Sequence, residues 1–164
     1  MNTSHEAKTF PIDVCGHVLL VTATWEADRL CRIHLALETQ GDPHRMEETG
    51  DSKARALAAH LLAVLKGDGL PMPYGLPLGT AFQRRVWEAT GKIPCGCTAS
   101  YQEIAQAVGC RAPRAVGQAL KANPWPILVP CHRVVAHNGH MGGYSLGAAI
   151  KRLLLAAEKG GLPT

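Results

Sequence analysis

The sequence places a cysteine and a histidine side by side, Cys131 and His132, at the end of an apolar run that begins at residue 126. A thiol becomes a strong nucleophile when a neighbouring base or cation favours the thiolate, and an imidazole can act as either. The run is interpreted as a buried strand that ends at Cys131 and His132. Pro130 lacks a backbone N–H and fixes its own φ angle, so this strand must stop or turn at the thiol. Cys131 is therefore a candidate nucleophile, but a buried structural thiol fits the local pattern equally well.

The elements that hold this pair can be inferred from the residues before it. Ser100 to Glu103 has the pattern of a capping box and predicts a short helix that Gly109 ends. Pro113 suits the first turn of the next helix, which runs to about Ala122. Two short helices joined by a tight turn are a helix-turn-helix candidate, although helical hairpins are also common in protein cores.

Two more helices are predicted in the second half of the chain. Thr80 to Gln83 is another capping box and opens a helix to about Thr90. Apolar residues at helical spacing mark a final amphipathic helix: Ile150, Leu153, Leu154 and Ala157. The second half is therefore predicted to be mainly helical.

The first half has a different pattern. Residues 17–24 and 29–37 are rich in branched apolar side chains and predict two strands of a hairpin, with a polar turn at 25–28 between them. A polar loop at 38–50 precedes a predicted helix at 51–67.

A segment rich in glycine and proline divides the chain. Residues 67–80 hold four glycines and three prolines, which is typical of a linker. We therefore expect an α/β fold in which residues 1–75 form a small N-terminal α/β domain with a short antiparallel sheet. Residues 76–164 would form a mainly helical C-terminal domain that contains the helix-turn-helix.

Charge is distributed unevenly between the two halves. Residues 1–79 carry 7 Lys/Arg and 10 Asp/Glu, a net charge of −3, whereas residues 80–164 carry 10 and 3, a net charge of +7. A basic second half favours the docking of a polyanion such as DNA, although an ordinary solvated basic surface has the same composition.

Composition also bears on location. The 164 residues are 46% hydrophobic, yet no apolar run approaches the ~18 residues of a membrane span. The N-terminus lacks the basic and then apolar layout of a signal peptide. We expect an intracellular protein, cytoplasmic in a prokaryote or nuclear in a eukaryote, whose six cysteines stay reduced.

Five segments in sequence order resemble the motifs of the O6-alkylguanine-DNA alkyltransferases, also called methylated-DNA–protein-cysteine methyltransferases. They are Gly79–Glu88, Ile93–Pro94 with Ser100–Tyr101, Arg114–Gly117, Asn123–Val135 and Gly142–Ser145. The resemblance is dense from about residue 79 to residue 160, and it implies the family's two-domain fold.

The resemblance implies direct, irreversible transfer of the alkyl group from O6-methylguanine in DNA, and less readily from O4-methylthymine, to Cys131. His132 is expected to act as a base through a water molecule, and Glu158 to orient the imidazole. Because the thioether product does not hydrolyse under mild conditions, each molecule would act once and would need no cofactor. Without the resemblance, Glu158 would be interpreted as a solvated glutamate at a helix end.

The expected partner is double-stranded DNA that bears O6-alkylguanine, bound by a monomer away from any membrane. Chemistry on a base generally requires its extrusion from the stack. Arg114 matches the family's intercalating arginine, and Ala115 and Gly117 lie on a helix expected in the minor groove. That helix is rich in small residues: Ala112, Ala115, Gly117, Ala119 and Ala122. The alternatives are a phosphate contact for Arg114 and close helix packing for the small residues.

The resemblance also implies a pocket for the extruded base. Tyr101 is expected to bind guanine N3, the carbonyls of Cys131 and Val134 to accept from the guanine amino group, and the amide of Ser145 to donate to O6. Tyr144 would form the wall of the pocket.

Neighbouring positions complete the expected site. Asn123 matches a hinge asparagine of the family, which ties the DNA-recognition helix (here the one predicted from Pro113 to about Ala122) to the turn that carries the active-site cysteine. Asn before Pro is also an ordinary turn element. Arg133 is expected to pair behind the site. Leu146 stands where the family usually has glycine, which predicts a narrower pocket rim. An activated Cys131 would be the most reactive of the six cysteines.

No metal is expected. Cys95 and Cys97 are too close in sequence for a usual zinc pair, and the spacing of Cys15 and Cys31, which could imitate the zinc site of some relatives, is irregular.

Other functions were weighed against alkyl transfer. A non-catalytic damage sensor of the same family would have its acceptor cysteine replaced, typically by tryptophan. A helix-turn-helix regulator would need a dimerisation segment, and none is evident. A Cys-His hydrolase would need a separate histidine and asparagine.

Overall fold

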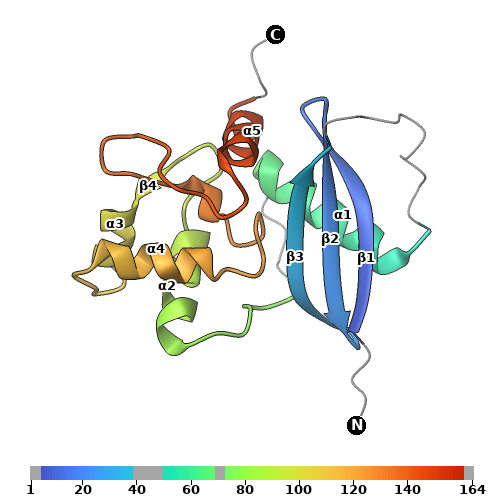
Figure 1. Cartoon of the computed structure of the whole chain (residues 1–164), viewed down its shortest axis with the longest axis horizontal. Helices are drawn as coiled ribbons and strands as arrows, with labels where there is room; N and C mark the ends of the chain where they lie inside the picture. Colours follow the sequence, from blue (N-terminus) through green and yellow to red (C-terminus); the bar gives the residue numbers. More distant parts are fainter. Residues whose placement is uncertain (1–4, 39–49, 69–72, 161–164) are drawn as a thin grey trace.

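The computed structural model describes residues 5–38, 50–68 and 73–160. A three-stranded sheet with its helix lies beside a group of helices (Figure 1). This is the fold class that the sequence predicts. The polar loop expected at 38–50 falls almost entirely outside the described residues, as does part of the expected linker.

The sheet consists of β1 (His5–Val14), β2 (His17–Glu26) and β3 (Arg29–Leu37), paired antiparallel in that order. Alternate residues of the strands are buried and pack in one cluster with α1 (Ser52–Lys66). Trp25, expected in the turn, belongs to β2 and is buried. The turn itself is Ala27 and Asp28, and Ala27 has a left-handed φ of 54°.

The remaining helices are α2 (Ala81–Gly91), α3 (Tyr101–Ala107), α4 (Pro113–Lys121) and α5 (Ala148–Glu158). Both predicted capping boxes are present, at the starts of α2 and α3. Helices α3 and α4 pack against each other across a short turn, so the helix-turn-helix geometry is present (Figure 1).

The strand expected from residue 126 to the pair of Cys131 and His132 is wrong. The segment is buried, but it forms a compact turn in which Pro126 and Val129 form an isolated bridge. Pro126 and Pro130 cannot donate to a strand ladder, and Ile127 has a left-handed φ of 72°. The prolines that mark the site in the sequence therefore also prevent a strand.

Cys131 begins a single turn of 3-10 helix, η2 (Cys131–Arg133). The next two residues, β5 (Val134–Val135), pair in parallel with β4 (Ala99–Ser100), directly before α3. This short pairing fixes the segment after the thiol to the start of the helix-turn-helix.

Two hydrophobic clusters meet at the thiol. The cluster beneath the sheet includes Trp125, Ile127 and Leu128, together with apolar residues of α5. The second cluster joins α2, α3 and α4 with Cys131 and Val134. The segment that carries the thiol therefore joins both cores. The domain boundary at residues 75 and 76 stays a prediction.

Candidate active site

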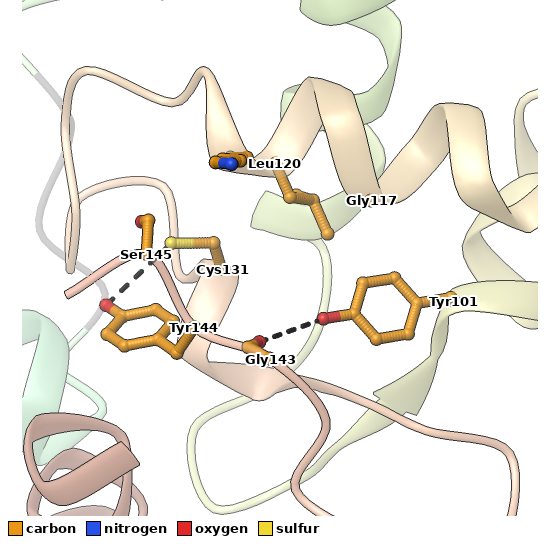
Figure 2. A pocket seen from close by; sticks show the side chains of 8 residues that line it. Tyr101, Gly117, Leu120, Cys131, Gly143, Tyr144 and Ser145 are labelled. Carbon is orange, nitrogen blue, oxygen red and sulfur yellow. Dashed lines mark hydrogen bonds between the residues drawn. The ribbon is translucent and has the colours of Figure 1, made fainter. Parts of the chain in front are cut away.

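A pocket of about 450 Å³ opens beside Cys131, within the range of roughly 300–1,000 Å³ usual for small-ligand sites (Figure 2). Its walls come from α3, α4, η2 and the segment before α5. The lining residues are Tyr101, Gly117, Leu120, Lys121, Cys131, Gly143, Tyr144 and Ser145. Leu146, expected at the rim, packs with the cluster beneath the sheet and is not among them.

The Cys131 side chain is buried, with 7% of the residue exposed. Asn123 Nδ2 lies 3.2 Å from Sγ. The Tyr144 hydroxyl lies 3.9 Å from Sγ (Figure 2). Burial raises the pKa of Cys131 above its ordinary value, and the contacts with Asn123 and Tyr144 offset this only in part. The resting thiol is therefore protonated at neutral pH, in contrast to the activated thiolate that the adjacent imidazole suggested, and its ionisation needs a base.

Such a base lies next to the thiol in the chain. His132 Nε2 is 2.7 Å from Glu158 Oε1, and both side chains are fully buried. Burial lowers the pKa of His132, and the opposing effect of Glu158 does not fully compensate, so the ring is neutral at neutral pH. A carboxylate only accepts hydrogen bonds, so Nε2 carries the proton and Nδ1 is left as the acceptor. Within the described part of the chain, Nδ1 is buried without a partner.

The charge of Glu158 is held by its other neighbours. Arg133 donates to it from Nε and Nη2 at 2.8–3.0 Å, and the backbone N–H of Gly96 donates to Oε2 at 3.2 Å. Burial acts to raise the pKa of Glu158, but the contacts with His132 and Arg133 outweigh it and the pKa is lowered. Glu158 is therefore an ionised carboxylate whose side chain is fully buried.

Arg133 also ties this site to the rest of the fold. Its Nη1 donates to the carbonyl of Ile93 at 2.7 Å, and its Nη2 donates to the carbonyl of Val64, near the end of α1, at 3.2 Å. These contacts agree with the expectation that Arg133 pairs behind the site.

The residues expected around a bound base lie at different depths. Tyr101 and Tyr144 line the pocket, and the Tyr101 hydroxyl donates to the carbonyl of Gly143 at 3.2 Å (Figure 2). Ser145 is exposed at the pocket edge. Val134 is fully buried and is not among the lining side chains, so only its backbone is a candidate contact.

Asn123 lies between the end of α4 and the segment that leads to and contains Cys131 (residues 124–133, the active-site segment). Its Nδ2 donates to the carbonyl of Val129 at 3.0 Å, and its Oδ1 accepts from the backbone N–H of Trp125 at 2.9 Å. With the contact to Sγ, one side chain joins the helix end to the thiol.

The residues of α4 expected to face DNA do not all lie on the outside of the helix. Arg114 is exposed in the first turn, Ala115 is partly exposed, and Gly117 lines the pocket. Ala119, expected on the same outer face, is instead buried, and its carbonyl accepts from Trp87 Nε1 at 2.9 Å. Close packing inside the fold therefore explains Ala119.

One buried residue was not anticipated from the sequence. Lys151 of α5 is 0% exposed, and its Nζ donates to the carbonyls of Val134, at 2.7 Å, and Met141. The signal available was a lysine on the apolar face of a helix, one position after Ile150.

No group of three or more His, Cys, Asp or Glu side chains that could hold a metal ion occurs in residues 5–38, 50–68 and 73–160. Among the same residues, no helix is long and apolar enough to span a membrane.

A buried thiol that lines a pocket beside a helix-turn-helix is an arrangement that fits a DNA-binding protein with a cysteine in its site. Residues 81–160 match the family described as 6-O-methylguanine DNA methyltransferase, DNA binding domain. The chain is also 40% identical over 141 residues to the constitutive methylated-DNA–protein-cysteine methyltransferase of Bacillus subtilis, which covers 82% of this chain and 86% of that protein. The chain therefore belongs to the methylated-DNA–protein-cysteine methyltransferase family.

Other relatives are matched over a shorter part of their length. The bifunctional transcriptional activator/DNA repair enzyme Ada of Escherichia coli is 50% identical over 90 residues, which is 52% of this chain and 25% of Ada. The methylated-DNA–protein-cysteine methyltransferase of Methanosarcina mazei is 49% identical over 87 residues, and the match spans 55% of that protein.

The fold is shared with solved structures. The O6-methylguanine methyltransferase of Mycobacterium tuberculosis superposes with a TM-score of 0.71 at 36% identity, over 98% of this chain and 96% of that one. The Mycobacterium tuberculosis OGT in complex with DNA superposes with a TM-score of 0.68 at 34% identity, over 93% of this chain and 92% of that one.

Proposed function

We propose that this chain repairs duplex DNA by transferring a methyl group from O6 of guanine, and less readily from O4 of thymine, to Cys131. The observation that carries this proposal is the buried contact between His132 and Glu158, because His132 directly follows Cys131, whose thiol lines a pocket of suitable size. Family membership supports the same activity.

The bonds in this reaction balance without a cofactor. The Cys131 sulfur forms a bond to the methyl carbon while the bond from that carbon to O6 breaks, and the electron pair of the broken bond stays with the guanine. The proton that the thiol loses returns to the guanine ring. The products are S-methylcysteine and unmodified guanine, and because the thioether is stable each molecule reacts once.

His132 is the proposed route for the proton. Its Nδ1 is the acceptor atom left over by the Nε2 contact with Glu158, and one water molecule relays the proton from Sγ to it. The positive charge that then develops on the ring is stabilised by the carboxylate, as in other nucleophile–histidine–acid arrangements.

Helix α4 is the proposed reading element, lying in the minor groove. Arg114 projects from its exposed first turn and fills the gap that the extruded nucleotide leaves. Gly117, three residues along the same helix, lines the pocket that receives the base. Minor-groove readout is nearly independent of sequence, which suits damage that can occur anywhere.

Within the pocket, polar groups are available for the base. The Tyr101 hydroxyl, which donates to the carbonyl of Gly143 in this structure, donates to guanine N3 when the base is bound. The backbone N–H of Ser145 donates to O6. The carbonyls of Cys131 and Val134 accept from the guanine amino group. The carbonyl of Val134 already accepts from Lys151 and has a second lone pair for this contact.

The test is mass spectrometry of the intact protein and its peptides after incubation with a duplex that holds one O6-methylguanine. The expected result is one added methyl group on the Cys131 peptide, saturating at one per protein. Cys131→Ala should bind the duplex and gain no mass. Binding by the native chain without any mass change would instead support a non-catalytic damage sensor. Sedimentation of the free protein should show a monomer.

A further inference from the structure

Lys151 is a fully buried lysine for which the proposed reaction has no role. Fully buried lysines are rare, because the ammonium loses its hydration, and a methionine or leucine would fill the same volume without that cost. Lys151 therefore needs an explanation from its surroundings.

The ammonium joins two points of the chain that flank one turn. It donates to the carbonyl of Val134, just after the active-site segment, and to the carbonyl of Met141, just before the pocket wall. Between them the chain forms a tight turn, in which the N–H of Ala136 donates to the carbonyl of His140 at 2.8 Å. Lys151 thus closes both ends of this turn.

The same ammonium faces the pocket wall. It lies 5.8 Å from the centre of the Tyr144 ring, and the Tyr144 hydroxyl lies 3.9 Å from Cys131 Sγ. A cation within about 6 Å of an aromatic ring is attracted to its face. One buried charge therefore contacts the wall residue that touches the reacting atom.

We propose that Lys151 is a positioning residue for the alkyl transfer: it fastens the turn between Val134 and Met141, holds Tyr144 against the thiol, and places a positive charge where the thiolate forms. This proposal rests on the proposed function, because it explains how the wall of that same pocket is kept in place. Lys151 acts through these neighbours and does not touch the base.

Electrostatics favours a charged residue at this position over a neutral donor. Burial raises the pKa of Cys131, and the charge of Lys151 acts in the opposite direction. Burial likewise lowers the pKa of Lys151, and a negative Cys131 would raise it. The titratable and charged groups around the thiol are Lys151, Tyr144, Tyr101 and His132, with Glu158 and Arg133 behind His132.

The test compares Lys151→Met, which keeps the length but not the charge, with Lys151→Arg, which keeps the charge but not the shape. Arg152→Met, an exposed neighbour on the same helix, is the control. Two rates are measured: methyl transfer from an O6-methylguanine duplex, and carbamidomethylation of Cys131 by iodoacetamide across pH. The second rate reports on thiol ionisation without DNA, so it remains informative if the proposed function fails.

Lys151→Met should move the midpoint of the iodoacetamide profile upward by about one pH unit and slow methyl transfer about tenfold. Lys151→Arg should leave the midpoint in place and still slow transfer, because a planar guanidinium does not reproduce both carbonyl contacts. Arg152→Met should match the native chain in both rates. An unchanged midpoint together with native transfer in Lys151→Met would overturn the proposal. If Lys151→Met does not fold, native transfer by folded Lys151→Arg would overturn the positioning role.

Discussion

Asn123 Nδ2 donates a hydrogen bond to Cys131 Sγ across 3.2 Å, so a side chain that follows the end of α4 contacts the thiol sulfur itself. The same amide group also contacts the backbone of Val129 and Trp125. A methylated sulfur is a weak acceptor and carries extra volume. In the proposed reaction, alkylation of Cys131 would therefore disturb the link between α4 and the turn that carries the thiol.

Asn123→Ala removes this link. We expect the free energy of unfolding to fall by ~2 kcal/mol, because the buried backbone groups of Val129 and Trp125 lose their partner. Methyl transfer should slow about tenfold, since the thiol is no longer held in place. Urea unfolding and single-turnover rates measure the two effects. Asn138→Ala, in an exposed turn, should change neither, and equal behaviour of the two variants would contradict the prediction.

Glu158→Gln removes the charge between His132 and Arg133. Methyl transfer should slow ~10²-fold or more, because the imidazole loses the carboxylate that stabilises its protonated form. The free energy of unfolding should fall by ~3 kcal/mol, because a buried guanidinium loses its counter-ion. Rapid-quench transfer assays and urea titrations measure both changes. The control is Glu88→Gln, at an exposed position of α2, and native transfer by Glu158→Gln would exclude the role of this carboxylate in supporting His132.

The stability of the protein should depend on pH through His132. Burial lowers its pKa below the ordinary value of 6.5. As the pH falls through that value, the unfolded chain takes up a proton that the folded protein does not, so stability is lost toward acid. Glu158, whose pKa is also lowered, adds a second loss below about its ordinary value of 4.5. The melting temperature should be level near pH 7 and fall below pH 6.5, and His132→Gln should lack the first decline. A flat profile for the native protein would count against the burial of a neutral imidazole.

Arg114→Ala tests the proposed role of α4. Transfer from the duplex should slow at least tenfold, because nothing fills the gap behind the extruded base. Reaction with free O6-methylguanine should be unchanged, since no stack has to be opened. Arg114→Lys should restore part of the duplex rate if charge alone contributes. Equal slowing on duplex and free base would mean that Arg114 acts on the fold.

Cysteine reactivity in the absence of DNA should follow exposure. Cys15 and Cys97 are exposed, whereas Cys131 is buried and its pKa is raised by that burial. Iodoacetamide at neutral pH should therefore modify Cys15 and Cys97 before Cys131, as followed by peptide mass spectrometry. Faster modification of Cys131 would show that the resting thiol is ionised after all.

Local signals predicted the helices well. The capping boxes at Thr80 and Ser100 begin α2 and α3 because each hydroxyl accepts from the N–H three residues later, a contact that the sequence contains in full. The strand β1 could not be predicted from local signals in the sequence. Its first residues are polar and exposed, and its stability comes from pairing with β2.

The site was predicted in part, for a related reason. The roles expected for Cys131 and Glu158 came from the family resemblance. A contact between His132 and Glu158, which are far apart in the sequence, was expected on the same ground, and the two side chains lie 2.7 Å apart. Lys151 was missed because its partners are backbone carbonyls, which have no signature in the sequence. The raised pKa of the thiol was missed because burial depends on the whole fold.

The junction of the two cores has a consequence for how the protein folds. The backbone N–H of Ile33, in β3, donates to the carbonyl of Pro124 at 2.7 Å, and Trp125, Ile127 and Leu128 are buried beneath the sheet. Contacts between such distant parts of the chain form late, because a long loop must close first. The segment that precedes Cys131 therefore reaches its final packing only when the sheet has docked on it. Unfolding should accordingly be a single cooperative step that abolishes sheet and reactivity together.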